Sequence, residues 1–142
     1  MRMQWVLTWK KDPDAPTGKK GKARLVVLGF EDPYLGQENT CSPTPSKRSK
    51  QLLLQVIVQH GWELTKGDVT AAFLQGRKLE KSKYALAPPE LAEAMNIPVG
   101  ERVVRLITSV YGLAAAPLEW YAQVNLVLET LEGTRCDSDP CV

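Results

Sequence analysis

Residues 67–76 constrain this chain more than any other stretch, because they place one carboxylate between a strand-like run and a series of small residues. The strand-like run 62–68 predicts a strand that ends at Asp68. A carboxylate there can hold a hard divalent cation. The small residues that follow let a ligand approach the backbone, and the ring of Phe73 forms a wall beside it. An isolated Asp at a strand end is also a common turn or helix cap, and a lone ring is also a common core residue.

A second feature is a basic strand near the N-terminus. Residues 12–18 are dense in turn formers and separate two strand-like runs, at 5–9 and 22–29, which predicts a β-hairpin with a basic tip. Lys22 and Arg24 are two positions apart, so both side chains leave one face of the strand. That face presents two cations, one of which can bind phosphate bidentately. Two basic residues on an exposed strand are also common without any such ligand.

Charge is distributed unevenly along the 142 residues. Residues 1–50 hold ten Lys/Arg and five Asp/Glu, giving +5, whereas residues 51–142 hold eight and eleven, giving −3. The basic end can attract phosphates through Coulomb steering and counterion release. A solvated surface loop is the alternative interpretation.

Composition excludes several classes of protein. The apolar fraction of 44% and charged fraction of 24% are typical of a soluble globular protein, with no apolar run long enough to cross a bilayer. The first residues lack the apolar core of a signal peptide. Three cysteines without a CxxC pair and a single histidine argue against a disulfide framework and a structural zinc site, and favour reduced thiols in the cytosol or nucleus.

The remaining pattern alternates strands and helices irregularly, which predicts an α+β fold. Ser46 and Gly61 predict the two ends of a helix at 47–60, and apolar residues on more than one of its faces predict burial against several neighbours. The last clear helix is expected at 116–131, with Pro117 in its first turn. Other expected elements are a turn or short helix through 73–74, strands at 79–87 and 102–106, a helix at 90–96, and the start of a further element at 136–142.

A third segment, residues 109–121, contains Tyr111 and Gly112 ahead of this last helix. In their order and spacing, the basic strand, the segment around Asp68 and this third segment resemble the reverse transcriptase of copia-type LTR retrotransposons. Cys41-Ser42-Pro43, the Trp62 segment and residues 137–141 continue the resemblance, which covers almost the whole chain. The family usually carries a Lys-Gln pair where this chain has Ala114-Ala115.

The resemblance implies the right-hand polymerase fold, with a mixed or antiparallel sheet and packed helices. Residues 1–60 correspond to the fingers and 61–142 to part of the palm of an incomplete domain, without the C-terminal Tyr-x-Asp-Asp hairpin. The family's roles transfer to matching positions. Asp68 and the Val69 carbonyl would bind metal, Lys22 and Arg24 the triphosphate, Phe73 the sugar, and Tyr111 with Gly112 the base pair.

The implied activity is RNA-directed DNA polymerisation by a two-metal mechanism with Mg²⁺ or Mn²⁺. Its implied partners are an RNA or DNA primer–template, deoxynucleoside triphosphates and the remainder of a Pol polyprotein, with no membrane. The implied location is cytoplasmic virus-like particles, with the nucleus as a second compartment. Because one carboxylate is insufficient for two metals, this chain alone is expected to be inactive. The alternatives are a non-catalytic nucleic-acid-binding remnant and an inert relic.

Overall fold

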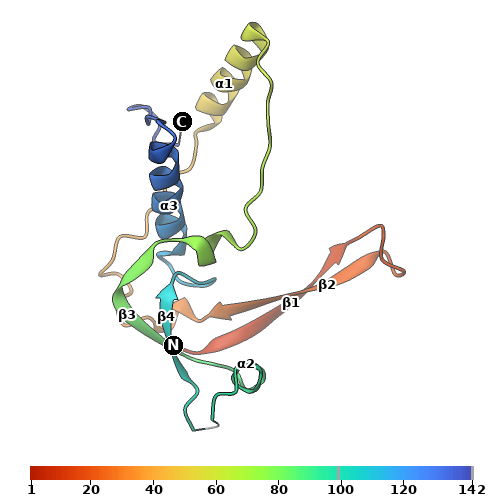
Figure 1. The fold of residues 1–142 in the computed structure, drawn as a ribbon, viewed down its shortest axis with the longest axis vertical. Helices are drawn as coiled ribbons and strands as arrows, with labels where there is room; N and C mark the ends of the chain where they lie inside the picture. Colours follow the sequence, from red (N-terminus) through yellow and green to blue (C-terminus); the bar gives the residue numbers. More distant parts are fainter. Residues whose placement is uncertain (99, 142) are drawn as a thin grey trace.

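The structure is a computed structural model that describes residues 1–98 and 100–141. Two antiparallel two-stranded sheets and three α-helices make up the described chain, together with two short 3₁₀ helices (Figure 1). This is the mixed α and β architecture that the sequence predicts. Helix α2 (Pro89–Ala94) lies between strands β3 (Lys78–Leu86) and β4 (Val103–Thr108) in the sequence. None of the described helices is long and apolar enough to cross a membrane.

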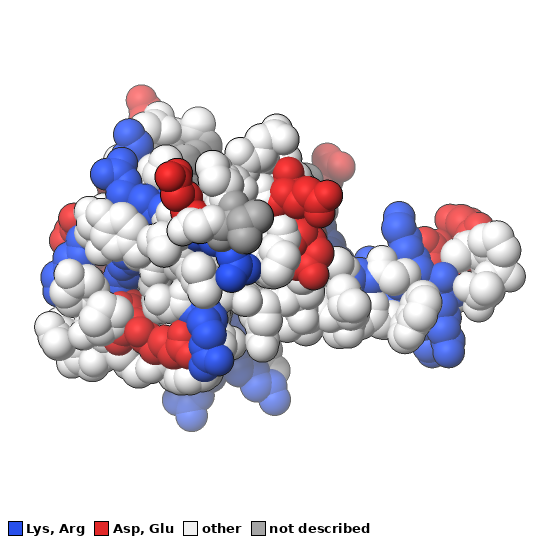
Figure 2. Space-filling view, turned by 90° about the horizontal axis from the view of Figure 1, so that it is seen from below, with Lys and Arg blue, Asp and Glu red and all other residues white. Residues whose placement is uncertain are grey.

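The N-terminal strands β1 (Met3–Lys11) and β2 (Lys19–Val27) form the predicted hairpin, which projects from the rest of the molecule (Figure 1). The turn forms because its backbone amides and carbonyls hydrogen-bond to one another. The Asp12 amide donates to the Gly18 carbonyl at 3.0 Å, and Gly18 adopts a positive φ of 65° that glycine tolerates without strain. Basic and acidic side chains gather toward this projecting end (Figure 2).

Helix α1 (Lys47–His60) begins and ends where the sequence predicts. The Ser46 hydroxyl accepts a hydrogen bond from the Ser49 amide, and Gly61 ends the helix in the left-handed conformation. The predicted burial against several neighbours is wrong, since none of its residues is buried and Val58 is 80% exposed. The helix points away from both sheets (Figure 1), so its apolar side chains have few partners.

The predicted strand at 62–68 is also wrong. Residues 62–69 have no regular secondary structure and are exposed, and they return from the end of α1 to the body of the molecule (Figure 1). A strand is stabilised by a paired neighbour, and both described sheets are completed by other segments. The expected turn follows as the 3₁₀ helix η2 (Ala72–Gln75).

The second sheet pairs β3 (Lys78–Leu86) with β4 (Val103–Thr108), with a register shift between Lys78 and Lys83. Helix α3 (Ala116–Thr130) follows it, close to the predicted bounds. The start of the chain joins the two sheets, because the Leu86 amide donates to the Met1 carbonyl at 2.7 Å. The core lies at this junction, and its buried members are Val27, Ala85, Leu106, Leu113 and Ala116.

A buried ion cluster fixes the loop after β2 to strand β3. The Lys83 ammonium contacts Asp32 at 2.5 Å and Glu38 at 2.6 Å, and its side chain is only 2% exposed. Burial disfavours the charged form, but the hydrogen bonds to both carboxylates outweigh it and raise the pKa of Lys83. The cluster holds residues 32–38 in place although this loop is rich in turn formers.

Candidate functional site

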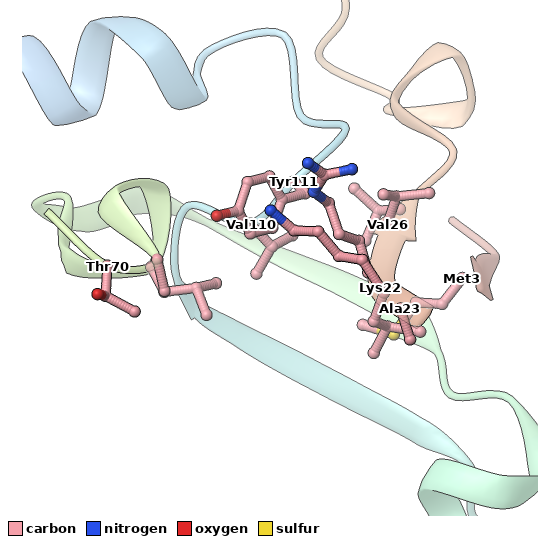
Figure 3. Close-up of a pocket in the computed structure, with 12 residues that line it drawn as sticks. Met3, Lys22, Ala23, Val26, Thr70, Val110 and Tyr111 are labelled. Atoms are coloured by element: carbon pink, nitrogen blue, oxygen red, sulfur yellow. The ribbon is translucent and has the colours of Figure 1, made fainter. Parts of the chain in front are cut away.

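The candidate site is a cavity of about 410 Å³ between strand β2, the segment before and within η2, and the loop that follows β4 (Figure 3). Its wall is largely apolar, and the basic side chains of Lys22 and Arg24 on strand β2 contribute to it. The lining residues are Met3, Lys22, Ala23, Arg24, Leu25, Val26, Val27, Thr70, Ala71, Leu74, Val110 and Tyr111.

Both predicted cations reach this cavity. In the hairpin register Lys22 pairs with Thr8 and Arg24 with Val6, so the two side chains share a face as their spacing requires. Lys22 extends from β2 toward the loop that carries Val110 and Tyr111 (Figure 3). Lys22 is exposed and Arg24 half-buried, and neither forms an ion pair with any described residue. Two positive charges therefore stand beside the cavity.

Tyr111 and Phe73 form the aromatic part of the site. Their rings meet edge to face, with centroids 5.3 Å apart and planes at 64°, a favourable geometry for two aromatic rings. Tyr111 lines the cavity, whereas Phe73 does not line it and packs against the core. The sequence left Phe73 open between a ligand wall and a core residue, and the structure places it at the boundary of the two.

Gly112 holds the loop against strand β2. It has a positive φ of 97°, and a Cβ built on it would lie 2.0 Å from the Val27 carbonyl oxygen. The Val27 amide donates to the Tyr111 carbonyl at 2.8 Å, so the loop and the strand are in direct backbone contact. Gly112 therefore allows a close approach of the chain's own backbone, which any side chain at this position would block.

Asp68 and Val69 lie beside the cavity without lining it. Both residues are exposed, and the neighbouring Thr70 and Ala71 are the ones that form the wall. Within residues 1–98 and 100–141, no group of three His, Cys, Asp or Glu side chains could hold a metal ion. One exposed carboxylate does not fit the needs of a two-metal centre, so these residues do not make a metal site by themselves.

Sequence reasoning missed Thr70, Ala71 and Val110 as parts of the wall. Ala71 has a positive φ of 52°, which turns the chain into η2. The small side chains between Asp68 and Phe73 were the available signal, because they let a ligand approach the backbone closely. Val110 could have been found only as the neighbour of Tyr111.

Comparison with known proteins identifies the family of this chain. The family described as "Reverse transcriptase (RNA-dependent DNA polymerase)" matches residues 1–140. The chain belongs to the reverse transcriptase family. This result confirms the resemblance drawn from Asp68, Tyr111 and the basic strand.

The curated relatives that the chain matches are Pol polyproteins from transposons. The chain is 33% identical over 137 residues to the retrovirus-related Pol polyprotein from transposon RE2 of Arabidopsis thaliana, a match that covers 96% of the chain and 9% of the relative. It is 32% identical over 144 residues to the Pol polyprotein from transposon TNT 1-94 of Nicotiana tabacum, which covers 100% of the chain and 10% of the relative.

A third relative, the Pol polyprotein from transposon RE1 of Arabidopsis thaliana, is 32% identical over 137 residues, which cover 96% of the chain and 9% of the relative. The chain thus spans about a tenth of the length of the relatives it matches. No solved structure matches it significantly.

Proposed function

We propose that this reverse transcriptase segment binds the triphosphate of an incoming deoxynucleotide in the cavity between β2 and the Tyr111 loop. The observation that carries the proposal is the placement of Lys22 and Arg24 on one face of β2, opposite Tyr111 across the same cavity. Two cations suit a polyphosphate, and an apolar, partly aromatic wall suits a sugar and base.

Each residue then has a distinct task. The Arg24 guanidinium binds two phosphate oxygens in a fixed orientation, and the Lys22 ammonium neutralises a third as a point charge. Tyr111, supported by Phe73, positions the sugar and base against the apolar wall. Positioning and charge neutralisation are the main contributions that a protein makes to phosphoryl and nucleotidyl transfer.

Asp68 and the Val69 carbonyl would supply one part of a metal site for Mg²⁺ or Mn²⁺. No group of three His, Cys, Asp or Glu side chains among the described residues could hold a metal ion, so we infer that other parts of a Pol polyprotein complete the site. Residues 1–60 would form fingers and 61–142 part of the palm of a right-hand polymerase domain. We therefore expect no primer extension by this chain alone, and extension that Asp68→Asn abolishes would overturn this inference.

The experiment that tests the triphosphate site is calorimetric titration of the chain with dTTP. We expect Arg24→Ala to weaken binding by about 10- to 100-fold and Lys22→Ala by less, because a charge-assisted hydrogen bond contributes roughly 1.5–3 kcal/mol. Lys50→Ala, which removes an exposed lysine from α1, is the matched control and should bind like the parent chain. Equal binding of dTTP and thymidine, or equal effects of all three substitutions, would contradict the proposal.

A second candidate function is nucleic-acid binding without catalysis, which the projecting basic hairpin favours. Five lysines gather there, and contacts of their ammonium groups with the phosphates of a nucleic acid would release counterions. Affinity for nucleic acid should then fall steeply with added salt. Salt-insensitive binding, or none, would count against this function. The five lysines are Lys10, Lys11, Lys19, Lys20 and Lys22.

A further inference from the structure

Ala71 lies at the wall of the candidate cavity in a backbone conformation that is unusual for alanine. Its φ of 52° and ψ of 40° are in the left-handed region, which a residue with a Cβ adopts only at an energetic cost. Such a conformation persists where the surrounding structure holds it, and strained residues cluster at ligand-binding positions. The shape of the cavity wall at Ala71 therefore depends on the groups that hold this turn.

Hydrogen bonds close the turn around Ala71. The Leu74 amide donates to the Ala71 carbonyl at 2.9 Å, and the Gln75 side-chain amide donates to the Thr70 carbonyl at 2.7 Å. The Thr108 hydroxyl of β4 donates to the Leu74 carbonyl at 3.2 Å, which ties the turn to the second sheet. The Gln75 bond joins the residue before the strained position to the last residue of η2, so it spans the whole turn.

Gln75 holds the cavity wall from outside the cavity. The turn lies across the cavity from Lys22 and strand β2 (Figure 3), and three of its residues form the wall: Thr70, Ala71 and Leu74. Gln75 is exposed and does not line the cavity. Arg77, two residues further on, contacts the Glu119 carboxylate of α3 at 3.1 Å and fixes the chain beyond the turn. The Gln75 amide therefore acts on the wall and not on a ligand.

We propose that Gln75 is a positioning residue for the nucleotide, because it holds the strained turn at Ala71 against which the sugar and base rest. The inference rests on the proposed function in assuming that a deoxynucleotide occupies the cavity. The two tasks are separate, since Lys22 and Arg24 on β2 take the phosphates and the turn across the cavity takes the nucleoside. Loss of the Gln75 hydrogen bond should weaken binding of a nucleotide without changing binding of its phosphates alone.

The test is calorimetric titration of the whole chain and its variants with dTTP and with inorganic tripolyphosphate, which has no sugar or base. Gln75→Met keeps an uncharged side chain of similar length but removes the donor. It should weaken dTTP binding about 3- to 10-fold, the range expected for the loss of one hydrogen bond. Binding of tripolyphosphate should be unchanged, which would also show that the variant is folded.

Gln55→Met makes the same change at an exposed position of α1 and is the matched control. It should bind both ligands like the parent chain. Unchanged dTTP binding by Gln75→Met, or an equal loss of tripolyphosphate binding, would overturn the proposal.

Ala71→Gly tests whether Gln75 acts through the strained residue. Glycine adopts the left-handed conformation without strain, so this variant should unfold at a higher urea concentration and bind dTTP like the parent. In the Ala71→Gly/Gln75→Met double variant the turn needs less support, so most of the dTTP affinity lost in Gln75→Met should return. A double variant that binds dTTP as weakly as Gln75→Met would overturn this role of Gln75.

Failure of this inference can be told apart from failure of the proposed function. Arg24→Ala should weaken binding of both ligands, whereas Gln75→Met should weaken binding of dTTP alone. If Arg24→Ala bound both ligands like the parent while Gln75→Met lost dTTP affinity, the triphosphate site would fail and the role of Gln75 would stand. The reverse pair of results would leave the triphosphate site intact and overturn the role of Gln75. A parent chain that binds neither ligand would overturn both.

Discussion

At the scale of single residues, Gly112 determines how the Tyr111 loop meets strand β2. Gly112→Ala would add a Cβ 2.0 Å from the Val27 carbonyl oxygen at a φ of 97°. We expect it to destabilise the chain by more than about 3 kcal/mol, because the contacting atom is backbone and cannot move aside easily. The free energy of unfolding in urea measures the effect.

Gly36→Ala is the matched control for that substitution. Gly36 also has a positive φ, of 81°, but a Cβ there would meet no atom within 4 Å. It should therefore cost only about 1–2 kcal/mol, the strain of a left-handed backbone alone. Equal losses in the two variants would show that backbone conformation, and not the contact with Val27, explains the need for Gly112.

Single residues of the site were predictable where the signal is local. Lys22 and Arg24 share a face because strands have a period of two, which the sequence shows directly. The contact between Gly112 and Val27 was not predictable, since it depends on how two distant segments meet. The irregular backbone that leads to Asp68 was not predictable for the same reason, because the strand expected there has no partner among the described residues.

At the scale of elements, the position of helix α1 depends on the segment that follows α3. Asp139 is 6% exposed, and its carboxylate accepts the Ser46 amide at 2.9 Å and the Cys141 amide at 3.1 Å. Hydrogen bonds from the Ser49 side chain and then from these amides lower the pKa of Asp139 to about 2. The ionised carboxylate therefore fixes residues 139–141 to the start of α1.

The lowered pKa of Asp139 sets the sign of the pH dependence of folding stability. The stabilisation by Asp139 is fully present above its ordinary pKa of 3.8 and is lost as pH falls toward about 2. Asp139→Asn should lower the melting temperature at pH 6 and flatten its dependence on pH between about 4 and 2. Melting curves across that range test this, and a variant with the same pH dependence as the parent would contradict it.

Helix bounds and helix burial differ in how far sequence predicts them. Ser46 and Gly61 give the two ends of α1, because capping involves only residues within one turn. Apolar composition predicts that a helix will be covered, but it carries no information about which segment covers it. The expected strand at 62–68 was wrong for a related reason, since pairing depends on an edge supplied by a distant part of the chain.

At the scale of the whole molecule, the elements radiate from a small core instead of enclosing it. The hairpin and α1 both extend away from the junction of the sheets (Figure 1), and many large apolar side chains are exposed. Exposed apolar surface of this extent favours association between copies. We therefore expect the isolated chain to self-associate at micromolar concentrations, with α1 as one of the contacting surfaces.

Val58→Lys tests this expectation at a side chain that is 80% exposed. It should reduce self-association in sedimentation velocity while changing the free energy of unfolding by no more than about 0.5 kcal/mol, since an exposed site contributes little packing. Gln55→Lys adds the same charge to an exposed polar position of α1 and separates the loss of apolar surface from charge repulsion. Association that Val58→Lys leaves unchanged, or that both variants reduce equally, would show that the apolar surface of α1 does not drive it.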